Sequence, residues 1–356
     1  MCEPTRDDLR VHLQALSVQG AVGGDPGQPG AANRVDPSSP RPLLELQPVD
    51  SLDVTILIDN FIDILLASGP GVARAPMGWE GFEREPLIAE HGYSLLVSVT
   101  SGQRTATILY DGGLGRASLL HNLDVLGISV ADLRAIVLSH GHLDHHGGLE
   151  GLVRRVGRRN LPLVLHPDAW RDRKLVFPTG MEVHLPPPSR ADLEREGVTV
   201  TEERGPSLLA DNMIATTGQV ERGTSFERGF PIHHARTNGN WEPDAWIWDD
   251  QAAVIHVRNR GLVVLSGCSH AGAVNVLRHA QRITGVEHVH GFMGGMHLTG
   301  GLFEPIINPT LDEMARISPD LLVPGHCSGW KAIQEIARRF PTSYVHSSVG
   351  TRLHFG

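Results

Sequence analysis

Apolar and polar positions in the first half of the chain alternate between strand-like and helix-like patterns. Short apolar runs bounded by glycine, proline or polar residues predict strands. Apolar residues spaced three and four apart, followed by a glycine, predict helices that end at that glycine. The predicted strands are 54–59, 93–100, 105–111, 134–139 and 161–167, and the predicted helices are 118–127 and 147–157.

The second half of the chain repeats this alternation. Two apolar runs separated by a short turn predict a hairpin, and helices and strands then follow in turn. The predicted strands are 252–259, 261–267, 287–295 and 320–326, and the predicted helices are 270–285, 310–318 and 330–340. Strands alternating with helices in both halves indicate an α/β fold, with either two sheets or one large sheet covered by helices.

Two segments interrupt the pattern. Residues 20–42 hold five glycines and five prolines, a composition that cannot bury enough apolar surface to offset its chain entropy. We therefore expect a disordered or loosely attached leader over 1–48. Residues 168–250 have the least regular pattern, and we expect them to form an insertion or lid within a single domain spanning 49–356. Trp241, Trp246 and Trp248 lie there, and they either line a substrate pocket or pack the insertion onto the core.

The composition narrows the choice of partners. Hydrophobic residues make up 40% of the chain and charged residues 20%, and the formal net charge is -9. This charge argues against a nucleic-acid backbone as the main partner. No apolar run approaches the roughly 18–20 residues of a membrane helix, and the N-terminus lacks the apolar core of a signal peptide. We expect a cytoplasmic protein that acts on a small molecule without a nucleic-acid or membrane partner, and the oligomeric state stays open.

Histidine and aspartate residues cluster most closely in LSHGHLDHHGG, residues 138–148, which we term the metal loop. It follows a predicted strand, so alternate side chains project to one side and His140 and His142 can bind one ion. The turn then presents Asp144 and His145 to a neighbouring ion. Imidazole nitrogen and carboxylate oxygen suit zinc, iron or manganese. His146 fits this arrangement less well and is better placed as a supporting or pocket residue.

The metal loop resembles the HxHxDH signature of the metallo-β-lactamase-fold superfamily. Asp111, in LYDGG, fits the superfamily's first motif, an aspartate that braces the metal loop. The resemblance extends to the dihydropterin–ribofuranosylaminobenzene phosphate synthase-like branch, also described as metal-dependent hydrolases. It implies an αββα sandwich with metals at the edge between the two sheets. The motifs that carry this second resemblance are HNLDVLG (121–127), GCSHAGAVN (267–275), GGMHL (294–298), PGHCSG (324–329) and VGT (349–351).

The resemblance implies further metal ligands in the second half. Gln219 stands where most members carry a third histidine, so that ligand is either missing or supplied from elsewhere. Residues 267–270, which we term the GCSH turn, follow a predicted strand. There Cys268 replaces the usual bridging aspartate, and His270 could fill the position left by Gln219. The alternative for Cys268 is packing under the following helix. His326, again after a strand, matches the last metal histidine.

Two neighbouring residues receive weaker assignments. Cys327 points away from the site if His326 points in, so we expect it to be structural. His297, in GGMHL, is a candidate acid or oxyanion donor, with a packing role as the alternative.

The leading hypothesis is a metal-dependent hydrolase with one or two zinc ions, iron or manganese being possible substitutes. Metal-bound hydroxide would attack an ester, lactone, amide or phosphoester bond, because a bound metal lowers the pKa of water to about 7. Asp144 and His297 are the candidate catalytic residues. One alternative is a synthase-like transferase that joins a pterin to an arylamine and releases pyrophosphate. The other is a non-catalytic or iron redox protein.

Overall fold

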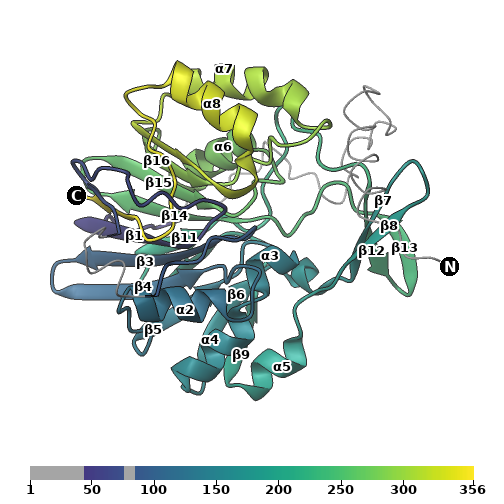
Figure 1. Cartoon of the computed structure of the whole chain (residues 1–356), viewed down its shortest axis with the longest axis horizontal. Helices are drawn as coiled ribbons and strands as arrows, with labels where there is room; N and C mark the ends of the chain where they lie inside the picture. The colour runs from purple at the N-terminus through teal and green to yellow at the C-terminus, as the bar shows by residue number, and fades with distance from the viewer. Residues whose placement is uncertain (1–43, 76–84) are drawn as a thin grey trace.

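The computed structural model describes residues 44–75 and 85–356. Two sheets pack face to face and helices cover both outer surfaces (Figure 1), which confirms the predicted αββα sandwich. The first sheet has the strand order β2-β18-β1-β3-β4-β5-β6-β9. Its strands are β2 (Val72–Ala73), β18 (Arg352–Phe355), β1 (Ser51–Ile58), β3 (Ser94–Ser101), β4 (Arg104–Tyr110), β5 (Leu133–Val137), β6 (Leu161–Leu165) and β9 (Val198–Glu202).

The second sheet has six strands and is built from the second half of the chain. In order across the sheet, they are β10 (Ser207–Leu209), β11 (Ile214–Thr216), β14 (Ala252–Val257), β15 (Gly261–Ser266), β16 (Val289–Gly294) and β17 (Leu321–Pro324). β14 and β15 form the predicted hairpin, whereas β15, β16 and β17 run parallel. β4, β5, β6 and β9 of the first sheet are parallel as well. Parallel strands end at one edge of a sheet, which is where ligand-binding loops gather.

Helices lie outside the sandwich on both sides (Figure 1). Those of the first half are α2 (Ser118–Val125), α4 (Leu149–Val156) and α5 (Arg190–Arg195), whereas the one-turn α3 (Leu143–His146) belongs to the metal loop. Those of the second half are α6 (Ala273–Thr284), α7 (Ile307–Ile317) and α8 (Trp330–Arg339). The glycines predicted to end helices follow α2, α4 and α6 in the left-handed conformation, with φ of 65° at Gly127, 61° at Gly157 and 69° at Gly285, which is the usual glycine helix stop.

Three apolar layers hold the sandwich together. One lies between the sheets, a second between the first sheet and its helices, and a third between the second sheet and its helices. β1 shows how the sequence divides between layers. Leu52, Val54 and Ile56 alternate into the layer between the sheets, and Leu57 and Ile58 join the layer beneath the helices. The first three residues follow the period-two pattern of a strand, and the register shift between Ile56 and Ile58 brings the last two residues to the helix side.

The irregular segment 168–250 divides between the sandwich and a separate sheet. Its strands β9, β10 and β11 extend the two main sheets. The remaining strands form a four-stranded antiparallel sheet beside the sandwich (Figure 1), which we term the insertion sheet. Its order is β13 (Asn240–Pro243), β12 (His233–Thr237), β7 (Arg173–Val176) and β8 (Glu182–Leu185).

The leader prediction for 1–48 falls mainly on residues 1–43, which lie outside the described residues. The part that is described is attached to the second half of the fold. The Leu44 backbone N–H donates to the Ile283 carbonyl at 2.7 Å, and the Gln47 N–H donates to the Asn212 carbonyl at 2.8 Å. Among the described helices, none is long and apolar enough to cross a membrane.

Candidate metal centre

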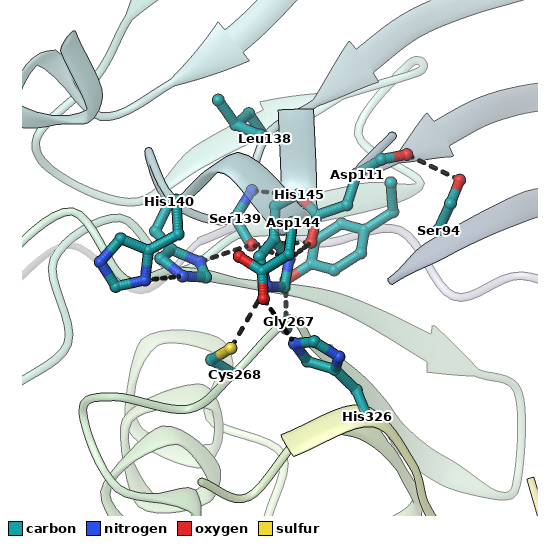
Figure 2. Close-up of polar contacts among 12 residues, drawn as sticks. Ser94, Asp111, Leu138, Ser139, His140, Asp144, His145, Gly267, Cys268 and His326 are labelled. Carbon is teal, nitrogen blue, oxygen red and sulfur yellow. Dashed lines mark hydrogen bonds and ion pairs between the residues drawn. The ribbon is translucent and has the colours of Figure 1, made fainter. Parts of the chain in front are cut away.

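A buried carboxylate from β4 fixes the metal loop. Asp111 follows the strand with a φ of 60°, and one of its oxygens accepts the Ser139 backbone N–H at 2.7 Å. Its other oxygen accepts the Ser139 hydroxyl and lies 2.7 Å from Nδ1 of His145 (Figure 2). The bracing contact expected of Asp111 is therefore present. It also sets the ring orientation of His145, because a carboxylate on Nδ1 leaves Nε2 available as a ligand atom.

The first ligand group consists of His140, His142 and His270. Nδ1 of His142 lies 3.0 Å from Nε2 of His140 and 3.2 Å from Nε2 of His270, and the three nitrogens lie within 4.8 Å of one another. Burial, reinforced by the neighbouring histidines, lowers the pKa of all three rings well below the ordinary value. The rings are therefore neutral at pH 7, which is the form that coordinates metal.

The second ligand group consists of Asp144, His145, Cys268 and His326. Nε2 of His145 lies 3.2 Å from Sγ of Cys268, and Oδ2 of Asp144 lies 3.3 Å from Nε2 of His326 (Figure 2). Nε2 of His326 is buried, and among the described residues it faces the Asp144 carboxylate without the geometry of a hydrogen bond. Since a buried imidazole nitrogen normally has a partner, this nitrogen and the surrounding donors fit a cation.

The charges of the second group are strongly coupled. Burial raises the pKa of Asp144, but His145 and His326 outweigh it and hold this pKa well below the usual range. Burial disfavours the charged form of His145, yet Asp111 and Asp144 raise its pKa to about 9. Two carboxylates thus concentrate negative charge where a cation would bind.

The GCSH turn brings the second half of the chain against the metal loop. A Cβ atom at Gly267 would lie 2.3 Å from the Ser139 hydroxyl oxygen, so glycine alone permits this approach. The Gly267 N–H donates to the Tyr110 hydroxyl at 3.1 Å. Ser269 follows with a φ of 56°, in the left-handed region. Cys268 and His270 consequently face the metal loop, and His270 lies within the first group, so its replacement of the ligand missing at Gln219 stays a prediction.

A second buried carboxylate holds the turn that carries His326. Asp59 follows β1, and its Oδ1 accepts the His326 backbone N–H at 2.8 Å. The Asp59 Oδ2 accepts the Ser347 hydroxyl at 2.5 Å. Asn60 adds a weaker link, since its side-chain amide donates to the His326 carbonyl at 3.0 Å. These contacts hold a backbone that enters the left-handed region, with a φ of 48° at His326.

One expectation for this turn is wrong. Cys327 was expected to point away from the site, but its Sγ lies within 4.8 Å of both Cys268 Sγ and a ring nitrogen of His326. The chain leaves β17 in a 3-10 turn rather than an extended segment, so consecutive side chains can face one centre. His297 also lies at the site, with its ring 4.3 Å from that of His270.

Three other histidines complete the comparison with the sequence. His146 lies 3.3 Å from the Pro186 carbonyl, and burial lowers its pKa to about 4. Two histidines at the site were not predicted from the sequence: Nε2 of His91 lies 3.5 Å from Asp144, and Nε2 of His233 lies 2.8 Å from Nε2 of His142. Neither has a spacing that signals a ligand, because both approach from segments outside the recognised motifs.

A sequence model of the metallo-beta-lactamase superfamily matches residues 89–274, a range that contains the metal loop and the GCSH turn. The chain belongs to this superfamily. It is 28% identical over 277 residues to the 7,8-dihydropterin-6-methyl-4-(beta-D-ribofuranosyl)-aminobenzene-5'-phosphate synthase of Methanocaldococcus jannaschii, an alignment covering 76% of this chain and 92% of that relative. It is 27% identical over 270 residues to an uncharacterized protein of the same organism, covering 74% and 93% of the two chains.

A solved structure agrees with the fold of this superfamily member. A metal-dependent hydrolase of the beta-lactamase superfamily superimposes with a TM-score of 0.65 at 22% sequence identity. The match covers 85% of this chain and 98% of that structure. This match confirms the predicted fold.

Proposed function

We propose that this protein is a metal-dependent hydrolase of small molecules that uses one or two zinc ions. The observation that carries the proposal is the convergence of two groups of ligand-type side chains, one centred on His142 and one on the buried Nε2 of His326. Neutral imidazoles, a carboxylate and a thiol are the donor types that zinc prefers. Iron and manganese are the substitutes that the same donors accept.

Bound cations would acidify water and polarise the carbonyl or phosphoryl oxygen of a substrate. The protein's own contribution is positional. Asp144, with its pKa held low, stays ionised at neutral pH and can accept a hydrogen bond from the attacking water. His297 is half-buried beside His270, where its ring can donate a proton to a leaving group. Ester, lactone, amide and phosphoester bonds are the candidate targets.

A small cavity lies beside the turn that carries His326. It encloses about 220 Å³, and its wall includes the half-exposed Phe61 and the exposed Trp330. This volume is below the usual range of about 300–1,000 Å³ for ligand pockets, and the cavity adjoins the second ligand group through His326. We further propose that the protein acts on a small molecule in the cytoplasm.

The decisive experiment combines metal analysis with hydrolysis assays. Purified protein should contain about one to two zinc ions per chain and should hydrolyse at least one member of a panel of ester, lactone, amide and phosphodiester substrates. His142→Ala should lose metal and activity together. His184→Ala, an exposed histidine paired with Asp172, is the matched control and should retain both. Full activity in metal-free protein would contradict the proposal, and metal analysis would also identify an iron protein.

The second candidate is a transferase related to the pterin–arylamine synthases, because the relative at 28% identity is named as such a synthase. Its reaction would release pyrophosphate rather than consume water. Incubation with a pterin methyl-pyrophosphate and an arylamine, followed by a pyrophosphate assay, separates the two candidates. Pyrophosphate release that depends on the arylamine would favour the synthase.

A further inference from the structure

We propose that His233, from β12 of the insertion sheet, is a positioning residue that prepares His142 for metal binding. The inference rests on the proposed function, because it takes His142 to be a metal ligand. It adds a residue that belongs to neither the metal loop nor the GCSH turn, and it gives the insertion sheet a role in the centre.

The two ring nitrogens of His142 face different neighbours. Nδ1 lies toward the first ligand group, 3.0 Å from His140 and 3.2 Å from His270. Nε2 lies 2.8 Å from Nε2 of His233. A histidine that binds metal through one nitrogen usually donates a hydrogen bond from the other, which fixes both its tautomer and its orientation. His233 meets the nitrogen that the first ligand group leaves unused.

His233 is itself held in place by buried acidic and basic side chains. It is fully buried, and its Nδ1 lies 3.5 Å from Oδ2 of Asp244. That carboxylate is paired with the buried Arg173, which also binds Asp249. The Asp249 carboxylate accepts the backbone N–H of Gly141, the residue between the first two ligands, at 2.8 Å. The insertion sheet therefore meets the metal loop directly through His233, and Arg173 of the same sheet pairs with the Asp249 carboxylate that holds the loop backbone.

One pair of tautomers satisfies both contacts of His233. His142 carries its proton on Nε2 and donates it to Nε2 of His233, and His233 carries its proton on Nδ1 facing Asp244. This arrangement leaves Nδ1 of His142 unprotonated, with its lone pair directed at the first ligand group. Without His233, the His142 ring would lose a partner and could rotate or adopt the other tautomer.

The test is zinc affinity, measured by competition with a chromophoric chelator. His233→Ala should weaken the tighter zinc site by about 10–100-fold, the usual range for the loss of such a partner. It should also alter the visible spectrum of the cobalt(II)-substituted protein. His233→Gln should recover most of the affinity, because its amide oxygen can accept the same hydrogen bond. His234→Ala is the matched control, since neighbouring side chains of β12 point to opposite faces, and it should bind zinc as the wild type does.

Each outcome is decisive. Wild-type zinc affinity and an unchanged cobalt spectrum in His233→Ala would overturn the inference while leaving the proposed function standing. Equal losses of affinity in the alanine and glutamine variants, together with lower stability of both metal-free proteins, would reveal a packing role and also overturn it. A wild-type protein that binds no zinc, iron or manganese would refute the proposed function and this inference with it.

Discussion

The metal loop and the His326 turn are each held by a buried aspartate, but the two carboxylates act on different parts of their targets. Asp111 contacts a ligand ring, with its Oδ2 at 2.7 Å from Nδ1 of His145. Asp59 contacts the His326 backbone N–H through Oδ1 and does not meet the ring. Each aspartate directly follows a strand of the first sheet. An aspartate at the end of a strand therefore acts on the ligand ring in one case, at His145, and only on the ligand's backbone in the other, at His326.

The difference lies in which donors each oxygen receives. The Asp111 Oδ2 faces both the Ser139 hydroxyl and the His145 ring, so a neutral amide there would present N–H groups to the ring. The Asp59 Oδ1 receives both backbone donors, those of Asn60 and His326, and its Oδ2 faces only the Ser347 hydroxyl. A hydroxyl both donates and accepts. We therefore expect the negative charge of Asp111 to be needed for its contact with the His145 ring. At Asp59, a neutral side chain of the same shape should make the same hydrogen bonds.

The largest predicted effect follows from Asp111→Asn. Asparagine tolerates the positive φ of this position, so the backbone should persist. The His145 ring loses its charged partner, and we expect the metal-free protein to lose about 3–5 kcal/mol of unfolding free energy, as when a buried pair is broken. The amide also drives the ring proton to Nε2, so zinc affinity should fall by about 10–100-fold. Urea denaturation and chelator competition measure the two effects.

Asp124→Asn serves as the control because it removes the same charge from an exposed pair with Arg155. It should leave zinc binding unchanged. If Asp111→Asn bound zinc as tightly as this control, the proposed influence of Asp111 on the His145 tautomer would be refuted.

An intermediate effect is expected at Glu227, which supports the start of α6 in the second half of the chain. Glu227 accepts the backbone N–H groups of Val274 and Asn275 in the first turn of α6, which follows the GCSH turn. Burial raises its pKa from 4.5 to about 7 although those hydrogen bonds oppose the shift. Its protonated form therefore stabilises the fold fully below about pH 4.5, and this stabilisation is lost as the pH rises through about 7.

Glu227→Gln should remove this pH dependence. Relative to the variant, the wild type should lose roughly 3 kcal/mol between pH 4.5 and pH 8, at 1.36 kcal/mol per pKa unit. Urea denaturation of the metal-free proteins across this pH range measures the unfolding free energy. Glu242→Gln, at an exposed glutamate, is the control for the same chemical change. A difference between Glu227→Gln and the wild type that stayed constant with pH would contradict a raised pKa.

The comparison of the two halves also explains what the sequence could predict. The candidate ligands of the metal loop lie within a few residues of one another, so their spacing and the preceding strand could be predicted from one short stretch of sequence. Helix stops such as Gly157 were equally local. The four-stranded insertion sheet was readable only in part: Asn238-Gly239 between β12 and β13 is a hairpin signal that the sequence prediction overlooked, whereas the other strands are short and show no sustained alternation. His233 was not readable, because it meets His142 across 91 positions of sequence. Cys327 was misplaced because the prediction assumed an extended chain where the structure has a 3-10 turn.

The smallest effect is expected for Asp59→Asn. With the amide oxygen in the place of Oδ1, both backbone hydrogen bonds persist, and the amide N–H can donate to the Ser347 hydroxyl. The unfolding free energy should therefore change by less than about 1 kcal/mol, and zinc affinity should match the wild type. Asp59→Ala leaves those buried N–H donors without an acceptor, so it should lower the unfolding free energy by about 1–3 kcal/mol. If Asp59→Asn instead weakened zinc binding as much as Asp111→Asn, then the charge of Asp59 would act on the His326 ring, and the two supports would be equivalent after all.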